Sequence, residues 1–348
     1  MSHPPLTVVL IVPTGIGAAI GGYAGDALPV VKALAPLCDR IITHPNVLNG
    51  AQMYWPIPQA LYVEGYGLDQ FAAGRWGLQP VHQNRIGVIF DQGIEPELRD
   101  RHRQAIEAAR ATLGLPITTL IETDAPLDVT LRTAASGASW GTLGNPGSLL
   151  RAADQLITTS GVEAIAVIAR FPDDLGSEAL TAYRHGSGVD ALAGAEAVIS
   201  HLIVREFGIP CAHAPALAPL PLDPDVAPRA AAEELGYTFL PCVLVGLARA
   251  PRLIRPDSCR TPSQIWADQV DALIVPAAAC GGSATLSLGN RLVIAVEANT
   301  TTLNVPPEPL GIRAIRARSY PEAIGLLAAY RAGLDPHLLH PAISPLNL

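Results

Sequence analysis

The sequence is poor in several residue types that carry well-known chemistry. Lys32 is the only lysine among 348 residues, so Schiff-base and serine–lysine mechanisms are nearly excluded elsewhere in the chain. The chain has no basic segment and a net charge of −8. This charge argues against nucleic acid and against anionic membranes as partners. We therefore expect a small-molecule ligand as the partner, with no nucleic acid and no membrane.

Cysteine is scarce as well. The five cysteines are scattered and form no Cys-x-x-Cys motif, which is typical of reduced thiols in a cytosolic compartment. Residues 1–25 have no basic start, and their glycines and prolines interrupt any apolar run. Neither a signal peptide nor a membrane-spanning segment is therefore expected. The sequence predicts a cytoplasmic protein.

What is abundant is apolar sequence, because 49% of the residues are hydrophobic and only 16% are charged. Short apolar runs alternate with amphipathic segments, which predicts an α/β fold of mostly parallel sheets flanked by helices, with Rossmann-like layering. A proline-rich link follows the strand-like residues 209–215 and runs to about residue 228. It favours two α/β lobes around a central cleft, 1–207 and 208–348. A single domain is the alternative.

The apolar runs and their turn signals place the individual elements. Strands are expected at residues 6–12, 40–43, 85–90, 117–121, 164–169, 209–215, 239–245, 272–275 and 292–296. Helices are expected at residues 26–37, 95–113, 146–157, 190–207, 229–235 and 321–332.

The first expected strand runs into a glycine-rich loop before the first helix. Strand, glycine loop and helix together can present backbone N–H groups to an anion. The loop is not a dinucleotide fingerprint, because Ile20 stands where its third glycine belongs, and no Gly-Lys-Ser/Thr of a phosphate loop follows. A ligand-contacting loop and a sharp turn without a ligand are both consistent with this pattern.

Ligands of open parallel α/β sheets lie outside the carboxyl ends of the strands. Several expected loops at these ends are small, apolar and nearly uncharged. A bound polar ligand is one way to satisfy their backbone groups; packing in a homo-oligomer is another. The ligand-binding candidates are Thr14, Gly15, Gly17, Gly21, Gly22, His44, Asn46, Asn49, Ser136, Ser139, Gly281, Gly282, Ser283 and Asn299.

Candidate reactive groups also follow the strands. Cys280 lies in Ala-Cys-Gly-Gly-Ser, and a helix beginning near Ser283 would lower its thiol pKa. An inert buried thiol is the alternative. Ser139, between Gly137 and Gly141, matches a nucleophile elbow only loosely. The catalytic candidates are Cys280, Cys211, His213, Asp91 and Glu297.

No His, Cys, Asp or Glu residues occur at a recognisable metal-binding spacing. No cofactor is therefore predicted. If a divalent metal binds, its expected ligands are Asp173, Asp174 and His185, because hard cations prefer carboxylate oxygens.

Six segments, taken together, resemble the family catalogued as domain of unknown function 3326. They are residues 11–26, 42–49, 136–142, 170–174, 210–215 and 279–284, which include Arg-Phe-Pro-Asp-Asp and Ala-Cys-Gly-Gly-Ser-Ala. The resemblance covers nearly the whole chain. It implies a cytoplasmic or stromal protein of a phototroph, and it brings no activity or catalytic residue.

The residues therefore carry the functional prediction. We expect an enzyme that binds an anionic or carbonyl-bearing metabolite and performs cofactor-independent hydrolysis or proton transfer, of the isomerase or racemase type. A non-catalytic metabolite-binding or sensor protein, a metal-dependent hydrolase, and an assembly protein whose apolar loops meet a second subunit are the alternatives.

Overall fold

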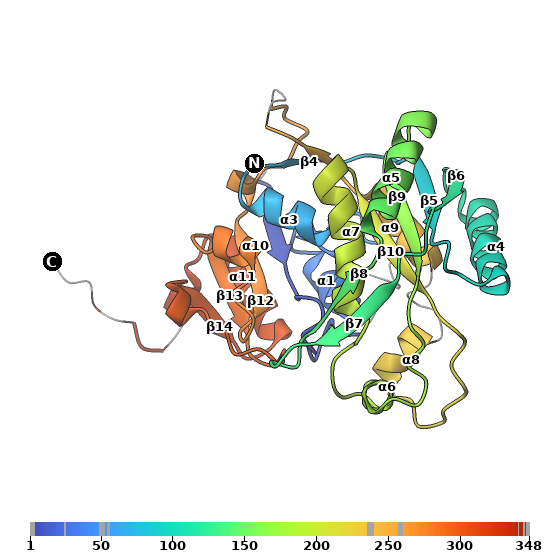
Figure 1. Ribbon diagram of the computed structural model, residues 1–348. Helices are drawn as coiled ribbons and strands as arrows, with labels where there is room; N and C mark the ends of the chain where they lie inside the picture. Colours follow the sequence, from blue (N-terminus) through green and yellow to red (C-terminus); the bar gives the residue numbers. More distant parts are fainter. Residues whose placement is uncertain are drawn as a thin grey trace.

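A computed structural model describes residues 4–23, 26–48, 53, 56–234, 240–256, 260–339, 341–343 and 345. Two parallel β-sheets lie side by side with helices around and between them (Figure 1). The expected fold class, mostly parallel sheets flanked by helices, is confirmed.

The larger sheet has six parallel strands in the order β14-β13-β12-β1-β2-β3. Strands β1, β2, β12 and β13 are apolar and almost entirely buried, as is typical of parallel strands that are covered on both faces. The bounds are β1 Thr7–Leu10, β2 Arg40–Thr43, β3 Ala60–Tyr62, β12 Ala272–Pro276, β13 Leu292–Val296 and β14 Ala314–Ala317.

The smaller sheet has four parallel strands in the order β10-β9-β5-β6. Two antiparallel pairs, β4 with β11 and β7 with β8, lie outside both large sheets. The bounds are β5 Ile86–Phe90, β6 Ile117–Glu122, β9 Ala164–Arg170 and β10 Cys211–Ala216, with β4 Gly77–Gln79, β11 Arg252–Ile254, β7 Val129–Thr133 and β8 Ser139–Leu143.

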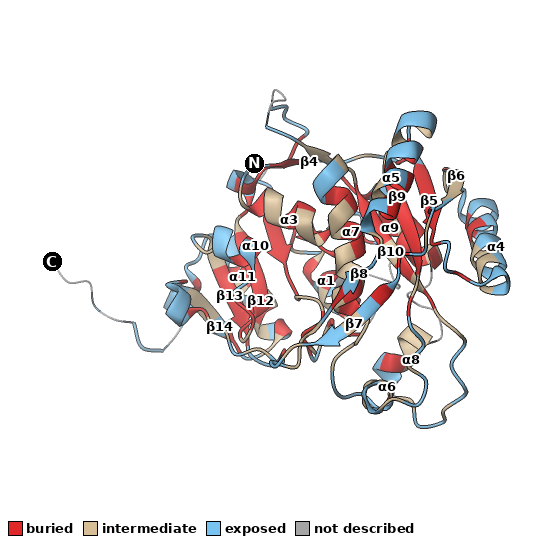
Figure 2. Cartoon of the chain, in the orientation of Figure 1, coloured by how far each residue is buried: buried red, intermediate tan, exposed pale blue. Residues whose placement is uncertain are grey.

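The helices cover the faces and edges of the two sheets. Figure 2 shows buried residues on the strands and on the inner sides of the helices, and exposed residues on the outer sides of α4 and α5. The bounds are α1 Leu28–Leu34, α2 Pro45–Leu48, α3 Gly65–Ala72, α4 Pro96–Leu113, α5 Pro146–Ser160, α6 Glu178–Arg184, α7 Ala193–Phe207, α8 Pro228–Glu234, α9 Leu240–Arg249, α10 Ser283–Ser287 and α11 Tyr320–Arg331. Short 3-10 turns lie at Ala267–Gln269, Glu308–Leu310 and Pro336–Leu339.

The chain builds the two sheets in a nested order. Strands β1 to β3 start the six-stranded sheet, β5, β6, β9 and β10 form the four-stranded sheet, and β12 to β14 complete the first. The expected boundary between residues 207 and 208 stays a prediction, but the six-stranded sheet takes strands from both sides of it.

One hydrophobic core joins the sheets through α9. Its buried members include Leu10 of β1, Val88 of β5 and Val243 of α9, and α9 packs against β3, β5, β9 and β10. Gly246 lets α9 approach the ring of Tyr62, because a Cβ built on Gly246 would stand 3.0 Å from that ring.

The expected strand at residues 239–245 is wrong for the described residues 240–245, which begin helix α9. A short apolar run has a similar composition in a buried helix and in a buried strand, so a run of this length does not separate the two by composition. Pro241 lies in the first turn of α9, where a missing N–H costs no helical hydrogen bond. The strands β7 and β8 of the hairpin were also not predicted from the sequence.

Three backbones meet closely where the sheets join. Ser139 N donates to Gly15 O at 2.8 Å, and Gly194 N donates to Ser139 Oγ at 3.2 Å. A Cβ on Gly194 would stand 2.2 Å from the Ser139 carbonyl oxygen, and a Cβ on Gly15 would stand 2.7 Å from Ser139 Oγ. Only glycine permits this approach, which fixes the loop after β1 against β8 and the start of α7.

Substituting Gly194→Ala should therefore destabilise the fold by about 2 kcal/mol or more, because backbone atoms must move to admit the methyl group. Urea denaturation followed by circular dichroism measures the change. Gly325→Ala is the control: a Cβ there contacts nothing within 4 Å, so this helical site should gain about 0.5–1 kcal/mol. Equal stabilities of Gly194→Ala and the wild type would contradict the steric argument.

Candidate functional site

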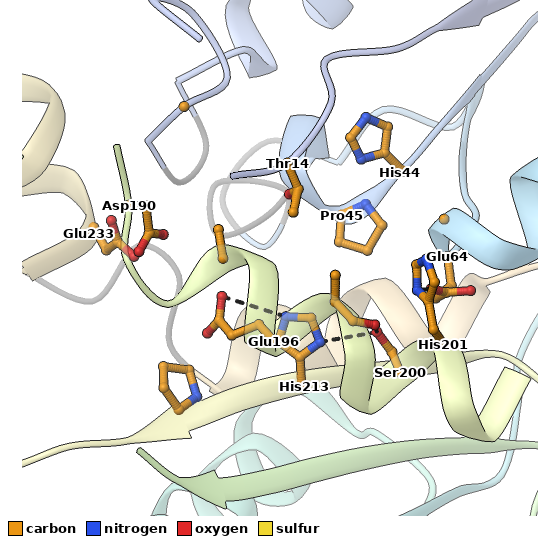
Figure 3. A pocket seen from close by; sticks show the side chains of 15 residues that line it. Thr14, His44, Pro45, Glu64, Asp190, Glu196, Ser200, His201, His213 and Glu233 are labelled. Carbon is orange, nitrogen blue, oxygen red and sulfur yellow. Dashed lines mark hydrogen bonds and ion pairs between the residues drawn. The ribbon is translucent and has the colours of Figure 1, made fainter. Parts of the chain in front are cut away.

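A small cavity of about 110 Å³ lies between the two sheets. Imidazoles and carboxylates dominate its walls, and they come from both halves of the fold (Figure 3). The lining residues are Thr14, Gly22, His44, Pro45, Glu64, Gly65, Asp190, Ala193, Glu196, Ala197, Ser200, His201, His213, Pro215 and Glu233.

One wall is formed by the carboxyl ends of adjacent strands. Thr14 follows β1, His44 directly follows β2, and Glu64 follows β3. The opposite wall is formed by α7 and β10, which pack against each other. The cavity therefore lies at the carboxyl edge of the six-stranded sheet, where parallel α/β folds commonly bind ligands.

His213 on β10 is the centre of a polar chain. Its Nδ1 lies 3.2 Å from Ser200 Oγ, and its Nε2 lies 3.7 Å from Glu196 Oε2. Glu196 and Ser200 are four residues apart on α7 and therefore share one helix face. The 3.7 Å separation is an ion-pair distance but too long for a hydrogen bond, so Glu196 does not occupy Nε2 with a hydrogen bond.

His201 is the next residue on α7 and forms an ion pair with Glu64. The second carboxylate oxygen of Glu64 caps α3 by accepting from Tyr66 N at 2.8 Å and Gly67 N at 3.2 Å. Burial by itself lowers the pKa of His201, but the hydrogen bond and charge of Glu64 outweigh it and raise the pKa above its usual value. Glu64 thus stabilises the protonated form of His201.

His44 has the opposite character. Val12 N donates to His44 Nε2 at 3.1 Å, and burial lowers the pKa of His44 to about 4. The ring is therefore neutral near pH 7, and because Nε2 accepts a hydrogen bond, its proton sits on Nδ1.

Two carboxyl groups meet at the other end of the cavity. Figure 3 shows the side chains of Asp190 and Glu233 next to each other. Burial raises the pKa of Asp190 well above its usual value, and the charges of Glu233 and Glu196 raise it further. Burial also raises the pKa of Glu233 to about 7, although the hydrogen bond that Tyr183 donates lowers it. The pair therefore retains a proton near neutral pH.

Of the candidate residues from the sequence, the cavity brings together Thr14, Gly22, His44 and His213. The side chain of Asn46 and the whole of Asn49 lie outside what the structure describes.

The rest of the glycine loop packs on protein. Gly17 approaches Gly188 and Val189, and Gly21 approaches Val12. Asn299 holds the loop in place, because its side chain accepts from Ile20 N at 2.9 Å and donates to Ile20 O at 2.8 Å. These residues support the cavity wall without lining the cavity.

Both cysteines lie away from the cavity lining. Cys280 is fully buried, and burial raises its pKa to about 11, the reverse of the lowered value that the following helix predicted. That helix, α10, has only five residues. Cys211 is also fully buried, and burial raises its pKa well above the usual value. Neither thiol is placed to act as a thiolate.

Asp91 and Glu297 have structural contacts instead. Asp91 accepts from the backbone N–H groups of Gly93, Leu127 and Arg170 at 2.9–3.0 Å, which ties together the strand ends of the four-stranded sheet. Glu297 is exposed and pairs with Arg316 at 3.4 Å.

The remaining ligand candidates lie on other surfaces. Ser139 begins β8 of a hairpin, without the strand-to-helix turn of a nucleophile elbow. Ser136 is exposed on the turn before it, and Gly281, Gly282 and Ser283 are exposed at the start of α10.

The three expected metal ligands are engaged separately. Asp173 pairs with Arg170 at 2.6 Å, and His185 contacts Asp223 at 3.1 Å. Asp174 accepts from Ser177 N through its backbone carbonyl. Within the described ranges, no three His, Cys, Asp or Glu side chains are arranged to hold a metal ion.

None of the four carboxylic acids of the cavity was among the candidates from the sequence. Glu196, Ser200 and His201 were visible as one polar face on an otherwise apolar helix, which was the available signal. No local sequence pattern connects the other three carboxylic acids. Glu64 follows β3, Asp190 precedes α7, and Glu233 lies in α8.

Comparison with known proteins identifies the family. The profile described as "Protein of unknown function (DUF3326)" matches residues 7–340. The chain belongs to this family. The Uncharacterized lipoprotein syc1174_c of Synechococcus sp. (strain ATCC 27144 / PCC 6301 / SAUG 1402/1) is 62% identical over 338 residues, which cover 97% of this chain and 94% of that protein. No solved structure matches the chain. The resemblance seen in the sequence is thus confirmed.

The expected cytoplasmic location is wrong by the same comparison, because this DUF3326 relative is named a lipoprotein. The expectation rested on cysteine usage and on the composition of the first residues, and neither reports on a lipid anchor. Within the described part of the chain, each helix is too short or too polar to cross a lipid bilayer.

The retained protons predict a pH dependence of stability. Between about pH 4.5 and 7 the folded protein holds protons on Asp190 and Glu233 that the unfolded chain has released, so these groups lose their stabilising effect as pH rises. The substitution Glu233→Gln removes the titratable carboxyl group of Glu233. The stability of wild type minus that of Glu233→Gln should therefore fall by up to about 1.4 kcal/mol per pH unit in this window.

Urea unfolding at several pH values measures this difference. Asp124→Asn is the control: hydrogen bonds from Arg151 lower the pKa of Asp124 to about 2, so its effect on stability should be constant above about pH 5. A pH-independent difference between wild type and Glu233→Gln would show that Glu233 is ionised throughout.

Proposed function

We propose that this DUF3326 protein binds a small polar metabolite in the cavity between its sheets and transfers a proton to or from it. One observation carries the proposal. The cavity contains His213, held between Glu196 and Ser200, and His201, held by Glu64. Two imidazoles with different partners thus face one bound molecule, which is the equipment of general acid–base catalysis.

The partners suggest a role for each imidazole. Glu196 would stabilise the positive charge that His213 acquires as a base, and Ser200 fixes the ring through Nδ1. A ligand hydroxyl or C–H group would lie in the space at Nε2. His201, kept protonated by Glu64, would act as the acid.

Nucleophilic catalysis has less support. Ser200 is buried inside α7, where its Oγ donates to Ala197 O at 3.4 Å. A mid-helix hydroxyl lacks the exposed turn from which serine nucleophiles attack, and the described thiols are all buried. We therefore assign Ser200 a positioning role.

A second function, capture of the metabolite without turnover, is favoured by one observation. The relative from Synechococcus is named a lipoprotein, and lipid anchoring holds a protein at a membrane surface. A cavity between two α/β units at that surface suits a binding protein as well as an enzyme.

Proton exchange with solvent separates the two functions. The protein is incubated in D₂O with a defined mixture of small amino acids, amines, hydroxy acids and keto acids, and each compound is weighed by mass spectrometry. Proton transfer predicts carbon-bound deuterium in one compound. His213→Gln should slow that exchange about 100-fold or more, because it removes the general base.

His82→Gln is the matched control, since His82 is exposed and outside the cavity lining; it should exchange at the wild-type rate. A compound that stabilises the wild type without exchanging would establish capture and reject proton transfer. If no compound exchanges or stabilises the protein, the proposal is contradicted.

A further inference from the structure

We propose that the ligand is a small amine: its ammonium group lies among Asp190, Glu196 and Glu233, and an oxygen acceptor on the same molecule faces His44. This inference rests on the proposed function, because it concerns the ligand of the same cavity. It reverses the anionic or carbonyl-bearing ligand expected from the sequence.

The charge of the lining is the first observation. Four of the described lining residues are carboxylic acids, and no described lining residue is an arginine or a lysine. Glu64 is already engaged by His201 and by the N–H groups at the start of α3. Glu196 pairs with His213, Glu233 accepts from Tyr183, and Asp190 accepts from Leu192 N. Within the described part of the chain none of these three carboxyls pairs with an arginine or lysine, and such a lining attracts cations and repels anions.

The neighbouring arginines are engaged elsewhere. Arg184 pairs with Glu234 at 2.7 Å and Arg229 pairs with Asp26 at 2.6 Å. Neither guanidinium belongs to the cavity lining. Protons retained by Asp190 and Glu233 currently offset the repulsion between these carboxyls, and an ammonium group would replace them with a fixed positive charge.

His44 supplies an independent observation at the other end. His44 is 8% exposed and lines the cavity. Nε2 accepts from Val12 N, which leaves Nδ1–H as the donor, and no hydrogen bond within the described residues uses it. A ligand oxygen in the cavity can therefore accept from this N–H without displacing a protein partner.

The size and spacing of the site indicate an organic cation. The cavity of about 110 Å³ admits a molecule of only a few heavy atoms. The described side chains offer no three-ligand arrangement for a metal ion, whereas an ammonium group needs only N–H···O contacts of about 2.9 Å and no fixed coordination geometry.

Three probes of nearly equal size isolate the charge: ethanolamine, ethylene glycol and glycolate. Binding of each to the whole protein is followed at pH 7.5 and constant ionic strength by isothermal titration and by thermal unfolding. Ethanolamine should bind and raise the unfolding temperature with concentration, and ethylene glycol and glycolate should bind at least tenfold more weakly.

Substitutions of the acidic lining residues test whether ethanolamine binds in this cavity. Glu196→Gln and Asp190→Asn preserve shape and should each weaken ethanolamine binding at least tenfold. Glu107→Gln is the control, because Glu107 lies on the exposed face of α4, where it pairs with Arg110, and it should bind as the wild type does. Circular dichroism verifies that each variant folds.

Each outcome is decisive for the charge of the ligand. Preferential binding of glycolate would overturn the amine inference and leave the cavity as a ligand site. Binding of ethanolamine that survives both acid variants, or the absence of binding by all three probes, would also overturn it. Proton transfer is judged separately, by deuterium exchange in His213→Gln.

Discussion

The site depends on the close contact of Gly15, Ser139 and Gly194. Through Ser139, the loop that leaves β1 is bonded to the hairpin and to the first turn of α7. This contact sets the position of Thr14 opposite the α7 residues that line the cavity. The glycines act here by permitting close contact between the loop after β1, the hairpin and α7. They position the cavity wall without lining it, and the functional atoms belong to side chains around the cavity.

Polar groups between two apolar sheets are costly to keep, and the surroundings of several of them here account for their state. Glu64 stabilises a charged His201, and burial keeps His44 neutral. Asp190 and Glu233 retain a proton where ionisation of both would be unfavourable. Groups of similar type thus have different protonation states in one small volume, which is a feature of sites that move protons.

The sequence predicts the fold better than the site. Buried parallel strands such as β2 and β13 are continuous apolar runs between turn signals, so their bounds agree with the expected residues 40–43 and 292–296. The prediction for the residues of α9 was wrong because a short apolar run has a similar composition in a buried helix and in a buried strand. The strand-end argument found His44 and Thr14, because topology alone places them at one edge. It missed Glu64, Asp190 and Glu233, since only tertiary packing brings them to the cavity. It favoured Cys280 as a reactive thiol, whereas burial raises the pKa of that thiol.

The central claim is that the cavity holds a proton donor beside a neutral imidazole. The protonation of His201 tests this claim most directly. Imidazole ¹⁵N chemical shifts, followed by NMR against pH in wild type and Glu64→Gln, give the titration of each histidine. The account predicts a midpoint for His201 above the ordinary value of about 6.5, a lower midpoint in Glu64→Gln, and a neutral His44 down to about pH 4. A His201 midpoint below 6.5 that Glu64→Gln leaves unchanged would contradict it.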